Sequence, residues 1–156
     1  MAIFSILAEK VTGSIVLDLF CGSGSLGIEA ISRGALFCCF NDINLSHFKL
    51  NMHLLEQPKF NYIEGDFLKV YSKLIRGTDI IFIDPPYGKF NCQKILDIIA
   101  MNELIKYNGT IIYEESAKSI INIDEKRFVI NKEKVYGDTK IYVIEVKNGN
   151  IISRDL

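Results

Sequence analysis

Short apolar segments alternate with segments of helical periodicity along most of this 156-residue chain. Five of the apolar segments have the length and composition of buried strands, since a short, nearly continuous apolar run is typical of a parallel sheet that is covered on both faces. The predicted strands are residues 15–18, 35–40, 60–64, 79–83 and 109–113.

The segments around these strands repeat their apolar residues every three or four positions, which is the spacing of a helix packed on a core. The first helical segment precedes residue 15, and the others follow the first four strands. Their apolar positions are Ile3, Phe4, Leu7 and Val11; Leu26, Ala30 and Ile31; Leu45, Phe48, Met52 and Leu55; Val70, Tyr71 and Leu74; Ile95, Leu96, Ile99 and Leu104. No linker or repeat interrupts the alternation. It predicts one doubly wound, Rossmann-like α/β domain over residues 1–156.

The end of the chain departs from this alternation. Two strand-like runs, residues 127–135 and 140–146, are joined by the four residues Tyr136-Gly137-Asp138-Thr139. So short a connection cannot cross over a sheet, and the two runs should therefore be antiparallel neighbours. The prediction is a seven-stranded sheet of five parallel strands and a C-terminal antiparallel hairpin.

Composition narrows the class of protein. The chain is 49% hydrophobic and 24% charged, enough for a core, but no apolar run approaches membrane-spanning length and no signal-peptide pattern opens it. We expect a cytoplasmic protein with no membrane association and four reduced, mostly buried cysteines that bind no metal. The net charge of −1 indicates that any nucleic-acid contact is local, because the basic residues of the last third lie among acids.

The first strand runs into a Gly-x-Gly-x-x-Gly turn formed by Gly22, Gly24 and Gly27. Such a turn allows a ligand to approach the backbone at the start of a helix, although a tight turn can need glycines without binding anything. Two acids favour a ligand: Asp18 ends the first strand, and Asp42 follows the second, where a carboxylate can hold a ribose diol. The pattern predicts a ligand that contains a nucleoside.

A second turn, Asp84-Pro85-Pro86-Tyr87, follows the fourth strand. Both prolines lack an N–H and have a fixed φ, so the turn is stiff and its carbonyls are free to accept hydrogen bonds from a ligand. Asp84 adds a charged acceptor and Tyr87 a ring face, which suits a planar amino group. An ordinary rigid turn is the alternative for a bare Pro-Pro pair.

These motifs resemble one family across nearly the whole chain. The Asp18 to Ala30 segment, Ser32-Arg33-Gly34-Ala35, Asp84-Pro85-Pro86-Tyr87 and Tyr136-Gly137-Asp138-Thr139 are similar to the RsmD type of class I S-adenosylmethionine-dependent methyltransferases. The resemblance implies methylation of guanine N2 in 16S ribosomal RNA, with naked RNA or a small-subunit assembly particle as partner. A monomer is favoured.

The resemblance also implies the roles of individual residues. Asp18, Phe20 and the glycines of the turn would lie under the methionine part of S-adenosylmethionine, and Asp42 would bind the ribose hydroxyls. Asp66 with the Phe67 backbone would read the adenine amino group, and the adenine would pack on Ile43 or Phe67. Asp66 as a simple helix N-cap and Phe67 as a core residue are the alternatives. The catalytic set would be Asp84, Pro85, Pro86 and Tyr87, with no metal.

One feature of the family does not match. RsmD-type proteins carry an N-terminal extension with a basic Arg-Gly-Arg-rich hairpin, whereas this sequence starts inside the first helix. We therefore expect weakened or partner-dependent RNA binding. Other functions that the motifs allow are a DNA adenine-N6 or cytosine-N4 methyltransferase, a cofactor-binding remnant without catalysis, and a dinucleotide oxidoreductase.

Overall fold

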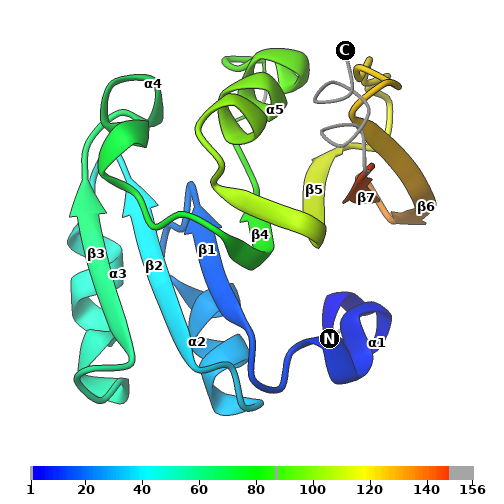
Figure 1. Ribbon diagram of the computed structural model, residues 1–156. Helices are drawn as coiled ribbons and strands as arrows, with labels where there is room; N and C mark the ends of the chain where they lie inside the picture. The colour runs from blue at the N-terminus through cyan, green and yellow to red at the C-terminus, as the bar shows by residue number, and fades with distance from the viewer. Residues whose placement is uncertain (1, 87, 148–156) are drawn as a thin grey trace, which may run out of the picture.

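The computed structural model describes residues 2–86 and 88–147, which form one seven-stranded sheet with helices on both faces (Figure 1). The strand order is β3-β2-β1-β4-β5-β7-β6. The strands are β1 (Ile15–Leu19), β2 (Phe37–Asp42), β3 (Phe60–Glu64), β4 (Thr78–Ile83), β5 (Ile105–Ser116), β6 (Phe128–Tyr136) and β7 (Thr139–Val146).

Strands β1 to β5 are parallel, and β7 pairs antiparallel with both β5 and β6. The expected five parallel strands and terminal hairpin are confirmed. From β1 the chain winds outward to β2 and β3 and then returns to β4 on the other side of β1. The carboxyl ends of β1 and β4 therefore border the crevice at which open α/β sheets bind ligands.

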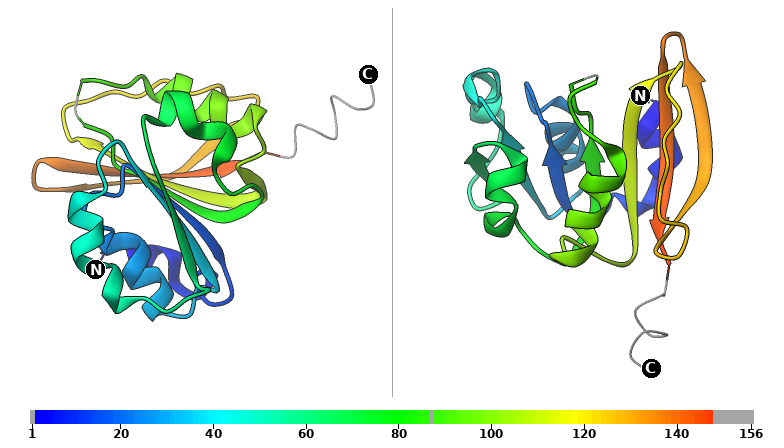
Figure 2. Two further views of the ribbon diagram at one scale, coloured as in Figure 1. Left: turned by 90° about the vertical axis from the view of Figure 1, so that its left-hand side faces the viewer. Right: turned by 90° about the horizontal axis from the view of Figure 1, so that it is seen from above.

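Helices cover the two faces unequally (Figure 2). On one face lie α1 (Ala2–Leu7), α2 (Ser25–Ser32) and α3 (Ser46–Asn51), and on the other lie α4 (Phe67–Val70) and α5 (Cys92–Met101). Each face has its own buried apolar cluster, because alternate residues of the same strands point to opposite sides. Short 3₁₀ turns follow α1, α3 and α4, so these α-helices are shorter than the apolar periodicity predicts.

Two boundaries differ from the predictions in ways that affect the site. Strand β2 extends through Asp42, which places that acid within the strand. Strand β5 runs from Ile105 to Ser116 and not only over residues 109–113, because its pairing with β7 continues through Glu114, Glu115 and Ser116. Leu104 was expected to belong to the helical segment that forms α5. It lies beyond the end of this helix, where it is buried.

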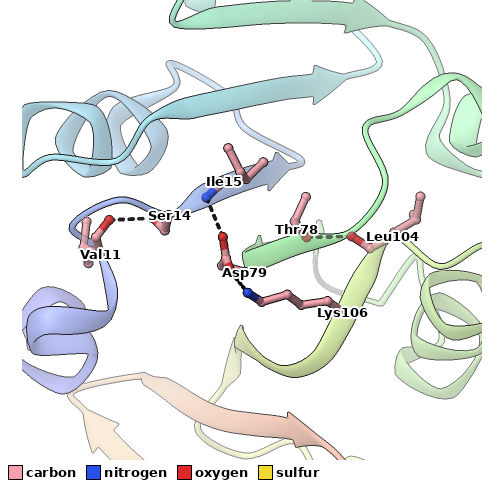
Figure 3. A network of polar contacts seen from close by, with 7 residues as sticks. All are labelled: Val11, Ser14, Ile15, Thr78, Asp79, Leu104 and Lys106. Carbon is pink, nitrogen blue, oxygen red and sulfur yellow. Dashed lines mark hydrogen bonds and ion pairs between the residues drawn. The ribbon is translucent and has the colours of Figure 1, made fainter. Parts of the chain in front are cut away.

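The amino ends of the central strands are joined by polar contacts (Figure 3). Asp79 at the start of β4 accepts a hydrogen bond from the Ile15 N–H of β1 at 2.8 Å and forms an ion pair with Lys106 of β5. Beside it, the Thr78 hydroxyl donates to the Leu104 carbonyl at 2.6 Å. This edge of the sheet is therefore satisfied internally, and the open polar groups are concentrated at the opposite, carboxyl edge.

The four cysteines have free thiols, with Cys38, Cys39 and Cys92 buried and Cys21 half-buried, as their apolar surroundings predict. None of the helices in the described ranges is both long enough and apolar enough to cross a membrane.

Candidate functional site

The glycines of the turn between β1 and α2 have different structural roles. Gly24 has a φ of +82°, and a Cβ added there would lie 2.6 Å from Cδ1 of Phe48. At Gly27, a Cβ would collide with the side chains of Phe40 and Cys38, so this glycine lets α2 pack directly on β2. Backbone conformation and close packing therefore both require the glycine pattern, and the turn brings its N–H groups to the carboxyl edge.

Asp18 lies beneath this turn and is almost completely buried. Its Oδ2 accepts the Gly27 N–H at 3.0 Å. Burial raises the pKa of Asp18 to about 8, although the hydrogen bond from the Gly27 N–H lowers it. The nearby charges of Asp84 and Asp42 also raise this pKa. A cationic group that bound next to Asp18 would stabilise its ionised form.

Asp42 at the end of β2 is tied to the same turn. Its Oδ2 accepts the Gly22 N–H at 2.8 Å, and its Oδ1 accepts the Asn44 N–H at 3.3 Å. A carboxylate offers about four lone-pair positions, so two remain for a diol. The neighbouring Asn41 is buried and donates to the Ile63 and Gly65 carbonyls, which fixes the start of the loop after β3.

Aromatic rings form one wall of the site. Phe20 has a φ of +55°, which is uncommon for a residue with a side chain, and its ring contacts Phe67 at 5.9 Å and Phe90 at 4.8 Å between centroids. Phe67 is 2% exposed and belongs to the core, while Asp66 caps α4 by accepting the Leu68 N–H at 3.0 Å. Phe67 is therefore a core residue and Asp66 is an N-cap, as the alternative interpretations state. Both residues also line the cleft.

The turn after β4 leaves only part of its predicted carbonyl acceptors free. Pro85 is buried and Pro86 is exposed, and the Pro86 carbonyl accepts the Lys89 N–H at 3.3 Å. No backbone N–H of the described residues reaches the Pro85 carbonyl. Tyr87 lies outside the described residues, so its expected stacking role stays a prediction.

The site has two halves, one at the ends of β1 and β2 and one at the ends of β4 and β5. They meet in a cleft of about 210 Å³ at the carboxyl edge of the sheet. Of the residues expected from the sequence, it brings together Phe20, Asp42, Ile43, Asp66, Phe67, Asp84 and Pro86. Asp18 and the turn glycines support its floor and are not among the residues that line it. Four further residues line the cleft: Asn41, Gly65, Lys89 and Phe90. Asn41 and Gly65 directly adjoin predicted residues, which is the signal that could have identified them.

The carboxyl group of Asp84 has an acidic neighbour that sequence reasoning also missed. Asp84 is exposed, yet its pKa is raised to about 7, and the largest cause is loss of hydration around its carboxyl group. The hydrogen-bond contact with Glu114 and the charges of Glu114 and Glu115 raise the pKa further. Glu114 was overlooked because the fifth strand was predicted to end at Tyr113.

Among the described residues, no three His, Cys, Asp or Glu side chains are grouped so that they could hold a metal ion.

The sheet order, the glycine turn and the Asp-Pro-Pro turn together define a class I methyltransferase fold. The family model described as Conserved hypothetical protein 95 matches residues 1–145, and the chain belongs to this RsmD-like family. Both the predicted fold class and the predicted family are thereby confirmed.

Known methyltransferases are similar to this chain in both sequence and structure. Ribosomal RNA small subunit methyltransferase D of Buchnera aphidicola is 34% identical over 145 residues, covering 90% of this chain and 75% of the relative. The solved structure of putative methyltransferase yhhF from Escherichia coli superposes with a TM-score of 0.85 at 20% identity, over 94% of this chain and 83% of that one. A putative methyltransferase, SMU.776, was solved in complex with S-adenosylhomocysteine; its TM-score is 0.66 at 20% identity, over 91% of this chain and 48% of that one.

Proposed function

We propose that this protein transfers a methyl group from S-adenosylmethionine to the exocyclic N2 amine of a guanine in small-subunit ribosomal RNA. The observation that carries the proposal is the position of Asp84, an acceptor at the end of β4 that lines the same cleft as Asp42, with the unpaired carbonyl of the buried Pro85 next to it in the chain. A relative named for ribosomal RNA methylation supports the RNA substrate.

The residues of the cleft fit the cofactor. Asp42 would hold the ribose hydroxyls with the lone pairs that Gly22 and Asn44 leave free, and the exposed Ile43 would cover one face of the adenine. Asp66 would accept from the adenine amino group with the carboxylate oxygen that does not cap α4. The cationic methionine part would lie near Asp18, whose burial makes its ionised form costly without a positive partner.

S-adenosylmethionine supplies an electrophilic methyl group on a sulfonium sulfur. The chain supplies orientation and charge stabilisation, since the lone pair of an exocyclic amine is delocalised into the base and is a weak nucleophile. Asp84 and the Pro85 carbonyl would accept the two N–H bonds, favour a pyramidal nitrogen and stabilise the positive charge that develops on it. This is positioning and electrostatic preorganisation, without a covalent enzyme intermediate.

A base within a duplex cannot reach this cleft, so the target guanine must be unpaired or flipped out. Tyr87 would stack on the extruded base, as aromatic residues do in many RNA-modifying sites. Lys89 is the basic side chain that lines the cleft, and it would meet a phosphate beside the target.

One assay tests the proposal. The protein and labelled S-adenosylmethionine are incubated in parallel with unmethylated small-subunit particles, naked 16S ribosomal RNA and DNA, and the labelled base is identified after digestion. N2-methylguanine from particles or ribosomal RNA is the expected product. Label found only in DNA as methyladenine or methylcytosine would identify the protein as a DNA amino-methyltransferase.

Cofactor binding is tested separately by thermal unfolding with S-adenosylmethionine or with NAD. A ligand that binds only the folded state raises Tm, by an amount that follows from about 2.7 kcal/mol at 100 times its Kd. Stabilisation by S-adenosylmethionine and not by NAD is expected. A shift with NAD alone would overturn the proposal in favour of an oxidoreductase.

A further inference from the structure

Glu114 on β5 lies beside Asp84 because of the register of the sheet. The pairs Phe82 with Ile112 and Ile83 with Tyr113 are laterally aligned in the parallel β4–β5 ladder. Asp84 directly follows Ile83 and Glu114 directly follows Tyr113, so the two residues are neighbours just beyond the last pair of this ladder. Laterally aligned residues project to the same face of a sheet, and the carboxyl group of Asp84 is accordingly in contact with that of Glu114.

This arrangement costs stability and is not explained by the fold. Two carboxylates at hydrogen-bond distance repel each other unless they share a proton. In residues 2–86 and 88–147, no N–H or O–H group donates to Asp84 or to Glu114, and neither forms an ion pair. Asp84 lines the cleft, and Glu114 is its neighbour outside the lining residues; once ionised, the pair would offer two adjacent hydrogen-bond acceptors to a base that enters beside Asp84.

The next residue provides a contrast. Glu115 projects to the opposite face of β5, where it lines a different hollow with Cys92 and Asn91, and its Oε1 accepts the Ser116 N–H at 3.0 Å. Strand alternation therefore sends one of two consecutive glutamates to Asp84 and the other away from it.

The chemistry of nucleobases distinguishes what two adjacent acceptors can bind. Guanine presents two neighbouring donors, the N1–H and the N2 amine. Adenine and cytosine present their amine beside a ring nitrogen that is an acceptor, so a second carboxylate at that position would face a lone pair. An acceptor pair therefore matches guanine and rejects the other two amino bases.

We propose that Glu114 determines the base specificity of this site by accepting the N1–H of the target guanine while Asp84 accepts an N–H of its N2 amine. This inference rests on the proposed function and names the residue that selects the base. Binding of guanine requires the pair to release the proton that it shares, and the other acids near Asp84 are Glu115 and Asp18. Methyl transfer should accordingly fall as the pH drops below about 7.

The test uses an analogue that keeps the 2-amino group, turns the neighbouring N1 from a donor into an acceptor, and replaces O6 by an amino group. 2,6-Diaminopurine has the 2-amino group of guanine, but its N1 is an acceptor. Small-subunit particles are reconstituted with guanine or 2,6-diaminopurine at the methylated position, and kcat/KM is measured for each. The wild-type protein should prefer guanine by about 10- to 100-fold, as expected for one hydrogen bond to a charged group.

In Glu114→Gln the amide can accept from guanine or donate to diaminopurine, so the preference should fall by about tenfold. The acid limb of the pH profile should also move to lower pH, because the charge next to Asp84 is gone. The matched control, Glu115→Gln, removes the adjacent charge on the other face and should leave the base preference unchanged. Particle affinity, measured by fluorescence anisotropy with S-adenosylhomocysteine present, should show the same change in base preference without depending on turnover.

The outcomes separate this inference from the proposed function. If the wild-type protein methylates neither particles nor ribosomal RNA, the proposed function is wrong and the base selection falls with it. If it methylates guanine and Glu114→Gln, folded by its thermal transition, keeps both the wild-type base preference and the wild-type acid limb, the function stands and the role of Glu114 is overturned.

Discussion

The two halves of the cleft treat their acids in opposite ways. In the half built by β1, β2 and the start of α4, each carboxylate accepts a backbone N–H: Asp18 from Gly27, Asp42 from Gly22, and Asp66 from Leu68. In the half built by β4 and β5, Asp84 and Glu114 receive no donor from the described residues and face each other. The first half is preorganised by its own backbone, whereas the second leaves its acceptors for a ligand.

This difference suits two ligands with different tasks. A cofactor that is used at every turnover benefits from a rigid site whose atoms are already in place. A base that must be chosen among four benefits from acceptors whose hydrogen bonds can be completed only by the correct partner, because the wrong base leaves them unpaired. The following predictions test whether the two halves are separable in this way.

The largest effect is expected at Asp84. Asp84→Ala removes an acceptor on the reacting amine and should lower kcat by about 100- to 1,000-fold, while the affinity for S-adenosylmethionine, measured by calorimetry, stays nearly intact. Asp84→Asn keeps one acceptor oxygen without the charge and should lose less activity. Loss of cofactor binding with retained turnover per bound cofactor would show that the halves are not separable.

Gly24 tests the cofactor half. Gly24→Ala places a Cβ against the Phe48 ring at a φ of +82° and should destabilise the fold by about 1–3 kcal/mol and weaken S-adenosylmethionine binding. Gly13→Ala is the matched control, since Gly13 has a φ of +80° with nothing within 4 Å of the added Cβ. It should cost about 1 kcal/mol in denaturant unfolding and leave cofactor affinity unchanged. Equal effects on cofactor affinity would contradict the packing role of Gly24.

Asp18 makes the stability of the ligand-free protein depend on pH. Its pKa is about 8 in the folded protein, against 3.8 for an ordinary aspartate, so the folded state binds the proton more tightly than the unfolded state. Stability from this group is complete below pH 3.8 and is lost as the pH rises towards 8, at up to roughly 1.4 kcal/mol per pH unit.

Urea unfolding between pH 5 and pH 8 measures this loss. Asp18→Asn, which keeps an acceptor for the Gly27 N–H, should flatten the decline. A variant that declines as steeply as the wild-type protein would assign the pH dependence to other groups.

The smallest effect is expected at Lys89. Lys89→Gln should weaken binding of 16S ribosomal RNA by about two- to fivefold and reduce the dependence of affinity on salt concentration, without changing cofactor affinity. Lys59, which is exposed at the amino end of β3, provides the control in Lys59→Gln. Equal losses in both variants would indicate nonspecific electrostatics.

Much of the fold followed from local patterns. Continuous apolar runs identified the parallel strands, and the four-residue connection at Tyr136 to Thr139 identified the antiparallel hairpin, because both depend on residues close in sequence.

The site was predictable only where a motif marked it. Glu114 and Phe90 were missed because their significance comes from neighbours distant in sequence: Asp84 across the β4–β5 register, and the Phe20 ring across the cleft. Strand ends also depend on the partner strand, which is why β5 continues past Tyr113 along β7. No periodicity in a single segment carries that information.

The polar contacts of Asp79 have a mechanical consequence for the whole molecule. They add side-chain contacts at the amino ends of β1, β4 and β5, where Asp79 accepts the Ile15 N–H at 2.8 Å and pairs with Lys106, to strands whose backbone pairing continues to Leu19, Ile83 and Tyr113 at the carboxyl ends. We therefore expect the amino ends of these strands to open less readily than the carboxyl ends, where the turns that carry the glycines and Asp84 begin. Slow hydrogen exchange at the Ile15 amide, together with faster exchange around the turns at the carboxyl edge, would reveal a sheet that opens from its reactive end.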